Sequence, residues 1–331
     1  MVGVRLTALG KYVPARIMTN DELATIVDTS DEWIRTRTGI HQRRIAAPEE
    51  NTSTLAIAAA KDALSKRGIE PSEVEMIVVA TMMPDNPFPA TACRVQSGIG
   101  AFNASAFDIS AACSGFVYAL EIAAQFIKTT AKRNALVIGA EVLSRAIDWQ
   151  NRSTCVLFGD GAGAAFIEAG QEERFLGSVL SADGTGKDLL YMPAGGSELP
   201  ASVETVQNRQ HFLKMKGQEL FQAVVPMVCD VIWSTCEKAG VSLDNIKLIV
   251  PHQANVHIIN EVAECLELPF ERFMINLHNY GNTSAASIPL ALIDAVEEEK
   301  ILPGDYVLIV GFGAGLTCAA SLICWDESFV K

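Results

Sequence analysis

Three segments of the sequence combine residue types suited to nucleophilic catalysis, and the first holds a cysteine. Cys113 stands in Asp108-Ile-Ser-Ala-Ala-Cys-Ser-Gly, between a run that predicts a strand and a helical pattern that begins near Ser114. A sulfur at a helix N-terminus meets free N–H groups and the positive end of the helix dipole, which favour a thiolate. The arrangement follows the nucleophile elbow of hydrolases. A small buried cysteine among alanines is the alternative for this segment taken alone.

His252 and Asn282 supply hydrogen-bonding groups in the other two segments. His252 directly follows the apolar run 247–250, at the carboxyl end of an expected strand, where open α/β sheets bind ligands. Asn282 precedes a helical segment, and we expect it to take in the second half of the chain the place that Cys113 takes in the first. A core histidine and a helix-capping asparagine are the structural alternatives. Together the three residues favour a Cys–His–Asn set that converges from three separate loops.

Two further motifs concern glycine and arginine. The run Gly311-Phe-Gly-Ala-Gly departs from G-x-G-x-x-G, and no helix with an acidic residue about 20 positions on completes a dinucleotide site. Close backbone approach and an N–H directed at an oxyanion are better uses of such glycines. Four arginines within 35–44 suit a phosphate-rich ligand or an acidic partner. A solvated helix end is the alternative for these arginines.

The elements that must position these residues alternate along the chain, which predicts a mostly parallel α/β sheet. Expected strands are 75–80, 105–109, 135–140, 154–158, 247–250, 273–277 and 306–310, and expected helices are 54–67 and 115–129. The order recurs at an offset of about 170 residues, which indicates a duplication. We therefore expect one half at 1–171 carrying the cysteine and another at 172–331 carrying the histidine and asparagine. No linker separates them, so they should pack as one body.

Composition limits the class of protein. The 331 residues are 49% hydrophobic and 20% charged, as in ordinary globular proteins. A net charge of −13 argues against nucleic-acid binding, which needs a basic face. The eight cysteines form no C-x-x-C pair and no zinc-like spacing with histidine, so we expect free thiols, no metal and a cytoplasmic location. We expect no membrane insertion, because no apolar run approaches the length of a spanning helix and Arg5 and Lys11 interrupt the N-terminal stretch.

Several long motifs in fixed order resemble those of the β-ketoacyl-acyl-carrier-protein synthase III family. They are Thr29-Ser-Asp-Glu-Trp-Ile, Arg37-Thr-Gly-Ile, Ala-Cys-Ser-Gly around Cys113, Phe158-Gly-Asp-Gly-Ala-Gly-Ala, Pro251-His-Gln-Ala-Asn, Gly281-Asn-Thr-Ser-Ala-Ala-Ser and Gly311-Phe-Gly-Ala-Gly. The resemblance implies a thiolase-like α/β fold, with two pseudo-twofold-related βαβαβαββ halves in five layers (αβαβα), in a homodimer. It also implies an acyltransferase that starts type II fatty-acid synthesis. A short acyl-CoA, usually acetyl-CoA, acylates the cysteine, and malonyl-acyl carrier protein then condenses with the acyl group, releasing CoA and carbon dioxide.

The same resemblance implies roles for individual residues and no cofactor beyond the CoA thioester substrate. Cys113 is the nucleophile, the N–H groups of Cys113 and Gly313 form the oxyanion hole, and His252 and Asn282 donate hydrogen bonds to the malonyl thioester oxygen. The implied contacts to CoA and the acyl group are Trp33 and Arg152 around the adenine, Arg37, Met215, Asn255, Phe312, and Phe88, which would close the acyl pocket of the second subunit and favour short primers. The implied carrier-protein contacts are Gln253, Ala254, His257, Lys214 and Lys216.

One departure from the family pattern concerns the carrier-protein face. Where relatives commonly carry basic residues, this chain has Gln222, His257, Glu264 and Cys265. An acidic carrier protein finds less positive charge there. The alternative is therefore a related condensing or acyl-transferring enzyme of secondary metabolism with a different acceptor. A degradative thiolase needs a second cysteine near the C-terminal glycines, and we expect Cys318 to be a packing residue instead.

Overall fold

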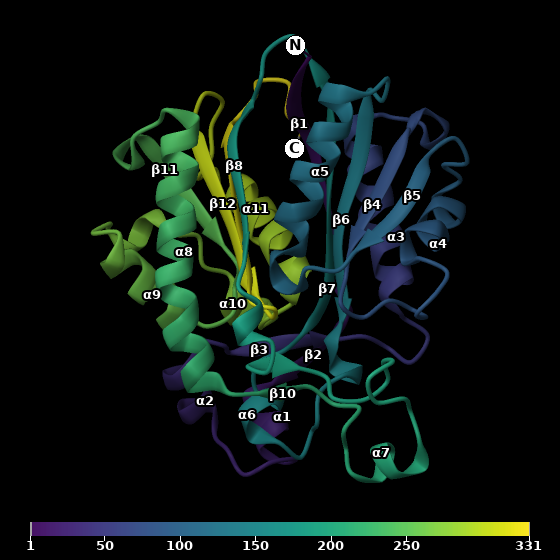
Figure 1. Ribbon diagram of the computed structural model, residues 1–331, viewed down its shortest axis with the longest axis vertical. Helices are drawn as coiled ribbons and strands as arrows, with labels where there is room; N and C mark the ends of the chain where they lie inside the picture. The colour runs from purple at the N-terminus through teal and green to yellow at the C-terminus, as the bar shows by residue number, and fades with distance from the viewer. Residues whose placement is uncertain (1, 331) are drawn as a thin grey trace.

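Two mixed β-sheets organise the molecule, and each draws its strands from one half of the chain (Figure 1). The computed structural model describes residues 2–330. The first sheet has the order β1 (Gly3–Tyr12), β7 (Asp160–Gly170), β6 (Asn134–Val142), β4 (Met76–Ala80) and β5 (Ser105–Ile109). The second has the order β11 (Ile246–Pro251), β12 (Tyr306–Gly313), β13 (Thr317–Cys324) and β8 (Phe175–Ala182). Each sheet combines parallel and antiparallel pairs.

Helices lie between the sheets and on both outer faces, which gives five layers (Figure 1). The middle layer holds α5 (Gly115–Thr129) and α11 (Ser287–Glu297), the first sheet is covered by α3 (Thr52–Arg67) and α4 (Thr91–Ile99), and the second by α8 (Gly217–Ala239) and α9 (Val256–Cys265). Ten of the eleven residues of α11 are buried. A helix buried on nearly all sides belongs between two layers rather than at a surface.

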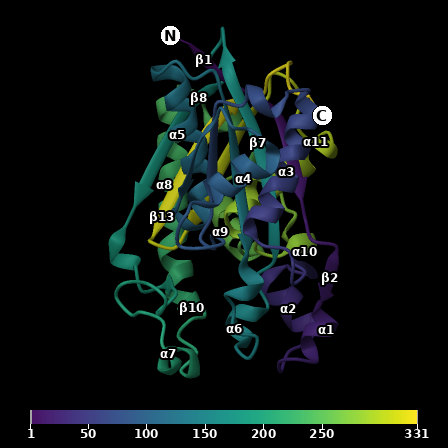
Figure 2. The ribbon, with the colours of Figure 1, turned by 90° about the vertical axis from the view of Figure 1, so that its right-hand side faces the viewer.

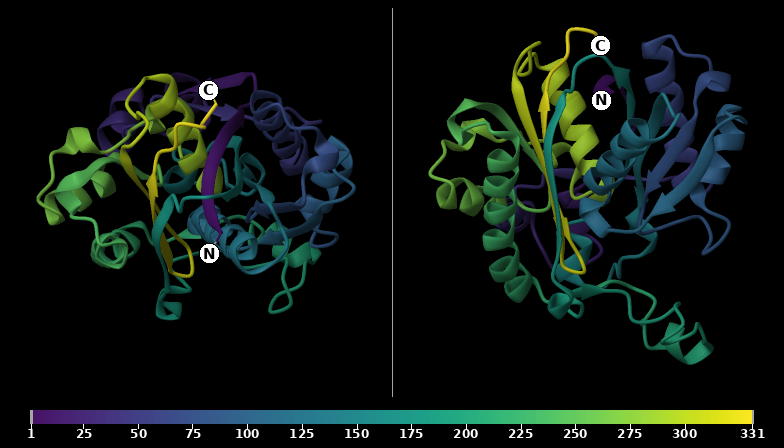
Figure 3. Two further views of the ribbon diagram at one scale, coloured as in Figure 1. Left: turned by 90° about the horizontal axis from the view of Figure 1, so that it is seen from above. Right: turned by 45° about the horizontal axis from the view of Figure 1, so that its top comes forward.

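Shorter elements gather at the end of the sheets away from the termini (Figure 2). They are β2 (Arg16–Thr19), α1 (Asn20–Ala24), α2 (Asp31–Thr38), β3 (Gln42–Ile45), α6 (Arg152–Cys155), β9 (Leu190–Tyr191), α7 (Val203–Gln207) and β10 (Lys214–Met215). At the opposite end the last described residues run along β1, where the amide of Val330 donates to the carbonyl of Thr7 at 2.9 Å (Figure 3).

The two middle helices begin with the same backbone turn. Ala112 before α5 and Ser284 before α11 have φ angles of 48° and 49°, and each stands in a 3-10 turn that leads into its helix. A positive φ is uncommon outside glycine and often marks a functional turn. The two turns contact each other at the centre of the molecule. Counted from these turns, Cys113 corresponds to Ala285, so the expectation that Asn282 takes its place is wrong; Asn282 stands earlier in its loop.

Two expected strands have a different conformation. Residues 154–158 form the end of α6 and the turn after it, and Phe158 alone makes a bridge, to Asn282. Residues 273–277 contribute a single bridge, from Phe273 to Ile249. Both segments are apolar because they are buried, and a short buried segment has the same composition in a helix, a turn or a strand.

The expectation that no helix has the length and apolarity of a membrane span also needs correction. Within residues 2–330, α8 alone meets that criterion, by length and composition only. In the fold this helix packs against β8 and β13.

Arg43 is fully buried, although it was expected to belong to an anion-binding cluster. Its guanidinium donates to the Asn20 side chain and to the carbonyl of Val156, both at 2.8 Å. Burial lowers the pKa of Arg43 to about 10. Arg43 therefore ties β3 to the segment after α6. Of the expected arginine cluster, Arg35 and Arg37 are exposed at the surface.

We expect Arg43→Met to lower the free energy of unfolding by about 2–4 kcal/mol, because each buried acceptor left without a donor costs about 1–3 kcal/mol. Denaturant unfolding measures the change. The matched control is Arg35→Met, at an exposed position whose guanidinium forms an ion pair with Asp31 on the same helix. A surface change of this kind should cost less than about 0.5 kcal/mol. Equal effects of the two substitutions would contradict a structural role for Arg43.

Candidate active site

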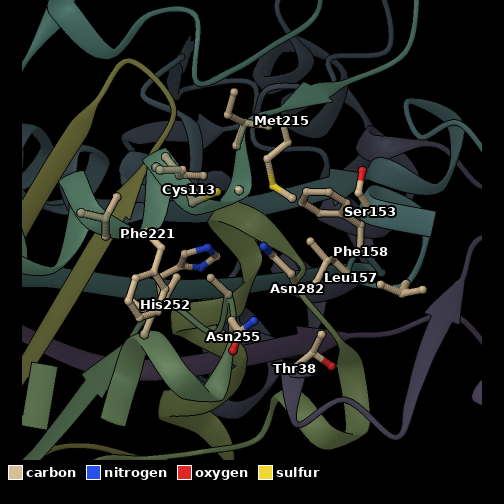
Figure 4. Close-up of a pocket in the computed structure, with 18 of the residues that line it drawn as sticks. Thr38, Cys113, Ser153, Leu157, Phe158, Met215, Phe221, His252, Asn255 and Asn282 are labelled. Atoms are coloured by element: carbon tan, nitrogen blue, oxygen red, sulfur yellow. The ribbon is translucent and has the colours of Figure 1, made fainter. Parts of the chain in front are cut away.

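A cavity of about 350 Å³ lies where the carboxyl ends of β5, β11 and β12 approach α2, α8 and α9. Cys113, His252 and Asn282 all border it, and Figure 4 shows their side chains grouped together at the cavity wall. The other lining residues are Trp33, Arg37, Thr38, Ser153, Val156, Leu157, Phe158, Leu190, Met215, Gly217, Leu220, Phe221, Val224, Ala254, Asn255, Ile258, Phe312 and Gly313. The three residues singled out from sequence therefore face one space, walled mostly by apolar side chains.

Cys113 lies in the 3-10 turn that leads into α5, with only 2% of its surface exposed. Burial raises the pKa of its thiol to about 12; a hydrogen bond with Ser284 opposes this rise, and the nearby Glu141 carboxylate adds to it. The helix N-terminus alone therefore does not leave a free thiolate at neutral pH. Attack by this sulfur requires a group that takes its proton.

His252 is held by contacts on three sides. Its amide donates to the carbonyl of Val310 at 2.8 Å, which continues the pairing of β11 with β12. Its Nδ1 lies 2.6 Å from the hydroxyl of Ser287 at the start of α11, and its ring packs edge-on to Phe312 with centroids 5.1 Å apart. Burial lowers the pKa of His252 to about 3, so the imidazole is neutral across the physiological range.

Asn282 is oriented by its own loop. The backbone amide of Asn282 donates to the carbonyl of Leu157 at 2.8 Å, and the amide of Gly159 donates to the carbonyl of Asn282 at 3.0 Å. The amide of Ser284 donates to Oδ1 of Asn282 at 2.9 Å. Because the oxygen is already engaged, the NH2 group is the part of this side chain available to a ligand. Gly281 before it has φ 67°, and a Cβ there would lie 2.8 Å from the Leu157 carbonyl oxygen.

Gly313 brings the end of β12 against the cysteine turn. A Cβ at this position would lie 2.8 Å from the Cys113 amide nitrogen and 3.0 Å from the Cys113 Cβ. The close approach that the sequence suggested for this glycine run is therefore present. It brings the Gly313 backbone against the backbone of Cys113. Backbone amides are the kind of donor that stabilises a negative oxygen in acyl transfer.

Five of the residues expected to bind CoA or the acyl chain line the cavity: Trp33, Arg37, Met215, Asn255 and Phe312. Asn255 also donates from Nδ2 to the carbonyl of Arg37 at 3.0 Å, which links α9 to α2. Arg152 stands beside the mouth, with its guanidinium 4.7 Å from the centre of the Trp33 ring. A nucleotide base can insert between these two side chains only if Arg152 moves away from the Trp33 ring.

The residues expected to touch a carrier protein have mixed surroundings. Gln253 is buried, and its amide donates to the carbonyls of Pro251 and Met274, so the expectation that it meets a docked protein is corrected. His257 is exposed and its Nε2 lies 2.8 Å from the carbonyl of Thr36. Ala254 is half-buried and lines the cavity. Lys214 is half-buried within β10, and Lys216 directly after it is exposed.

Two other expectations concern the outer surface. Phe88 is 83% exposed and does not line the cavity of its own chain. Among the four arginines of 35–44, Arg44 is half-buried and donates to the carbonyl of Pro14 at 3.2 Å. Arg35 and Arg37 are thus the two that present charge at the surface of α2.

Sequence reasoning missed three polar residues beside the triad. Ser284 and Ser287 stood in a motif interpreted only through its asparagine, and Glu141 follows the apolar run 135–140 at the carboxyl end of a strand, as His252 follows its own. Position at a strand end was the signal that could have singled out Glu141. Within residues 2–330 no group of three or more His, Cys, Asp or Glu side chains is placed to hold a metal ion.

Comparisons with known proteins agree with this geometry. Two family models match, described as 3-oxoacyl-[acyl-carrier-protein] synthase III at residues 107–184 and as the C-terminal part of the same enzyme at 236–325. A β-ketoacyl-[acyl-carrier-protein] synthase III of Caldanaerobacter subterraneus is 50% identical over 329 residues, covering 98% of this chain and 99% of the relative.

Solved structures show the same likeness. The 3-oxoacyl-[acyl-carrier-protein] synthase III of Aquifex aeolicus is 46% identical with a TM-score of 0.91, covering 98% of this chain and 100% of that one. The priming β-ketosynthase of the R1128 polyketide pathway is 35% identical with a TM-score of 0.91, covering 98% and 97%. The chain accordingly has the thiolase-like α/β fold expected of it and belongs to the β-ketoacyl-[acyl-carrier-protein] synthase III family.

Proposed function

We propose that this protein starts fatty-acid synthesis by condensing a short acyl-CoA, such as acetyl-CoA, with malonyl-acyl carrier protein. The reaction is a decarboxylative condensation that gives 3-ketoacyl-acyl carrier protein, CoA and carbon dioxide. The observation that carries the proposal is one cavity in which a cysteine sulfur, a neutral histidine and an asparagine amide lie together. Relatives that are 50% identical over nearly the whole chain carry the name of this activity.

In the first half-reaction Cys113 attacks the acyl-CoA carbonyl and CoA leaves. The backbone N–H groups of Cys113 and Gly313 stabilise the negative oxygen of the tetrahedral intermediate. The contact that only a glycine permits at position 313 supports this role. The product is an acyl thioester on Cys113.

In the second half-reaction malonyl-acyl carrier protein loses carbon dioxide and its enolate attacks the acyl-Cys113 thioester. His252 and Asn282 donate hydrogen bonds to the malonyl thioester oxygen, where the negative charge grows. The neutral state of His252 suits a donor, because the Ser287 hydroxyl can donate to Nδ1 and leave Nε2 as N–H. The free NH2 group of Asn282 is the second donor.

The residues around the cavity and at its mouth are the ones we expect to bind the substrate. Trp33 and Arg152 hold the adenine of CoA, Arg37 its phosphates, and Met215 and Asn255 the pantetheine arm, with Phe312 beside the acyl group. Their positions around the cavity and its mouth support this assignment. His257, Lys214 and Lys216 are the proposed docking residues for the carrier protein; His257 and Lys216 are exposed and Lys214 is half-buried.

The exposed Phe88 supports a homodimer in which this ring closes the acyl pocket of the second subunit and restricts it to short primers. Its side chain is 83% exposed and therefore free to contact a second subunit. A cytoplasmic location fits the eight cysteines, all of which are free thiols.

The choice of acceptor tests the proposal against its alternative, a condensing enzyme of secondary metabolism. The likeness to a priming β-ketosynthase of a polyketide pathway is the observation that favours this alternative. With acetyl-CoA as primer, we expect turnover with malonyl-acyl carrier protein to exceed turnover with free malonyl-CoA by at least about tenfold, a difference of about 1.4 kcal/mol. Product formation by mass spectrometry measures both. Condensation with malonyl-CoA alone would favour the alternative.

A further inference from the structure

Gln253 is buried two residues after the end of β11, and the half-reactions above give it no task. Its side-chain amide makes four hydrogen bonds, all to backbone groups. The Nε2 group donates to the carbonyls of Pro251 at 2.8 Å and Met274 at 2.9 Å. The Oε1 atom accepts from the amides of Asn276 at 3.0 Å and Leu277 at 3.3 Å. Two N–H donors and two lone pairs are all that such an amide has, so its hydrogen-bonding capacity is filled.

These four partners lie where a parallel strand pair breaks off. Ile249 of β11 bridges Phe273, and the amide of Met274 donates to the carbonyl of Ile249 at 2.8 Å. In a regular parallel pair the amide of residue 251 would be the next donor, to the carbonyl of Met274. Because proline has no N–H, Pro251 cannot make this bond, and the pairing ends there.

The side chain of Gln253 fills the gap that the proline leaves. It gives the carbonyl of Met274 the donor that Pro251 lacks. In a continued pair the carbonyl of Pro251 would accept directly from the amide of Asn276. Instead, Gln253 stands between these two groups, donating to the carbonyl and accepting from the amide. The two segments are therefore joined across the width of one amide group, and not by direct backbone bonds.

One of the joined segments carries His252. Gln253 is the next residue in the chain, and its backbone amide donates to the hydroxyl of Ser287 at 3.3 Å. The same hydroxyl lies 2.6 Å from Nδ1 of His252. Because the serine oxygen accepts from the Gln253 amide, its proton is free to point at Nδ1. Gln253 thus supports the imidazole through its backbone as well.

The other segment leads to Asn282. The short helix α10 (Leu277–Tyr280) begins at one of the two amides that donate to Gln253. The amide of Gly281 donates back to the carbonyl of Leu277 at 2.8 Å, and Asn282 is the next residue. The place of Asn282 relative to β11 therefore depends on the bonds that Gln253 makes at the start of α10.

We propose that Gln253 is a positioning residue that sets the separation between His252 and Asn282. In the second half-reaction both side chains donate to one malonyl thioester oxygen, so the spacing of the segments that carry them must suit a single atom. Both side chains border the same cavity (Figure 4). The inserted amide holds the segments farther apart than direct backbone bonds would. This inference rests on the proposed role of the two donors in condensation.

Gln253→Met tests the proposal. Methionine keeps the length of the side chain but offers no N–H donor and only a weak acceptor, so the segments lose their spacer. A misplacement of about 1 Å can cost on the order of 100-fold in rate, and we expect that loss in kcat for carbon dioxide release from malonyl-acyl carrier protein. The KM for this substrate should change only a few-fold, because the donors act on charge that grows in the transition state. Acetylation of Cys113 by acetyl-CoA should also change only a few-fold.

Pro251→Ala combined with Gln253→Met separates spacing from stability. Alanine supplies the missing N–H, so residue 251 can bond Met274 and Asn276 directly, and thermal stability should recover relative to Gln253→Met. The spacer is still absent, so decarboxylation should remain slower by on the order of 100-fold. A merely structural role predicts that stability and decarboxylation recover together. Pro251→Ala alone keeps the spacer and should decarboxylate within a few-fold of the unaltered protein.

Gln96→Met is the matched control. Gln96 is a half-buried glutamine of α4 whose Nε2 donates to the carbonyl of Ala104 at 2.7 Å, and it does not border the cavity. The same substitution at this position should leave both acetylation and decarboxylation unchanged.

Two failures are distinguishable. If the unaltered protein forms no acetyl adduct on Cys113, or the adduct does not react with malonyl-acyl carrier protein, the proposed function itself is wrong. If it condenses, the inference is overturned when Gln253→Met decarboxylates within about twofold of the unaltered rate (less than about 0.4 kcal/mol), or loses acetylation to the same extent. Should Gln253→Met fail to fold, the combined variant decides: slow decarboxylation with normal acetylation supports the spacer, and normal decarboxylation overturns it.

Discussion

Cys113→Ala should abolish acylation by acetyl-CoA. Alanine fits the space of the buried sulfur, so the cavity and both turns remain, but no nucleophile is left to form the thioester. We expect no acetyl adduct by intact-mass analysis and a loss of condensation of at least about 10⁴-fold, in the range found when a catalytic nucleophile is removed.

Cys318→Ala is the matched control for this result. Cys318 is also fully buried, on β13, and does not border the cavity. The expectation that it is a packing residue predicts a normal adduct in this variant. An adduct that survives in Cys113→Ala, or that disappears in Cys318→Ala, would show that Cys113 is not the nucleophile.

His252→Ala and Asn282→Ala should separate the two half-reactions. Each removes a donor to the malonyl thioester oxygen and leaves the sulfur and the backbone of Gly313 in place. Removing one donor to a developing oxyanion costs about 10²–10³-fold, and we expect that loss in malonyl decarboxylation. Acetylation by acetyl-CoA should stay within a few-fold of normal.

The measurement is release of labelled carbon dioxide from malonyl-acyl carrier protein by enzyme already acetylated on Cys113. Because burial holds the pKa of His252 at about 3, decarboxylation should show no inflection from this histidine between neutral pH and about pH 5. Equal loss of acetylation and decarboxylation in His252→Ala would contradict the division of roles.

The central residues of the site could be predicted from the sequence because each has a local signature. Cys113 stands between a strand pattern and a helix, and His252 follows an apolar run at a strand end, where α/β proteins bind ligands. The order of elements predicted most of the strands of both sheets. The five cavity residues expected to bind CoA or the acyl chain came from the family resemblance instead.

Properties that depend on packing could not be predicted from such local signatures. Arg43 is as charged in sequence as Arg37, and only the fold shows that one is buried and the other borders the cavity. Gln253 lies in the same motif as His252 and is buried in the protein interior. The pairing of Glu141 with Ser284 joins residues 143 positions apart, which no local pattern encodes.

The turn geometry also changes the meaning of the duplication. The repeat matched β4 and β6 to β11 and β12, but it expected a strand at 273–277 and assigned Asn282 to the place of Cys113. The backbone aligns Cys113 with Ala285 instead. The two halves thus contribute equivalent helix starts but different chemistry: a nucleophile from the first, and the hydrogen-bonding groups of His252 and Asn282 from the second.

A labelled chase tests the central claim most directly. The protein is loaded with isotopically labelled acetyl-CoA, the label is assigned by peptide mass spectrometry, and malonyl-acyl carrier protein is then added. We predict that the label resides on Cys113, leaves it on addition of the carrier substrate, and appears in 3-ketoacyl-acyl carrier protein. Label that never resides on Cys113, or that stays on Cys113 when malonyl-acyl carrier protein is added, would contradict the account.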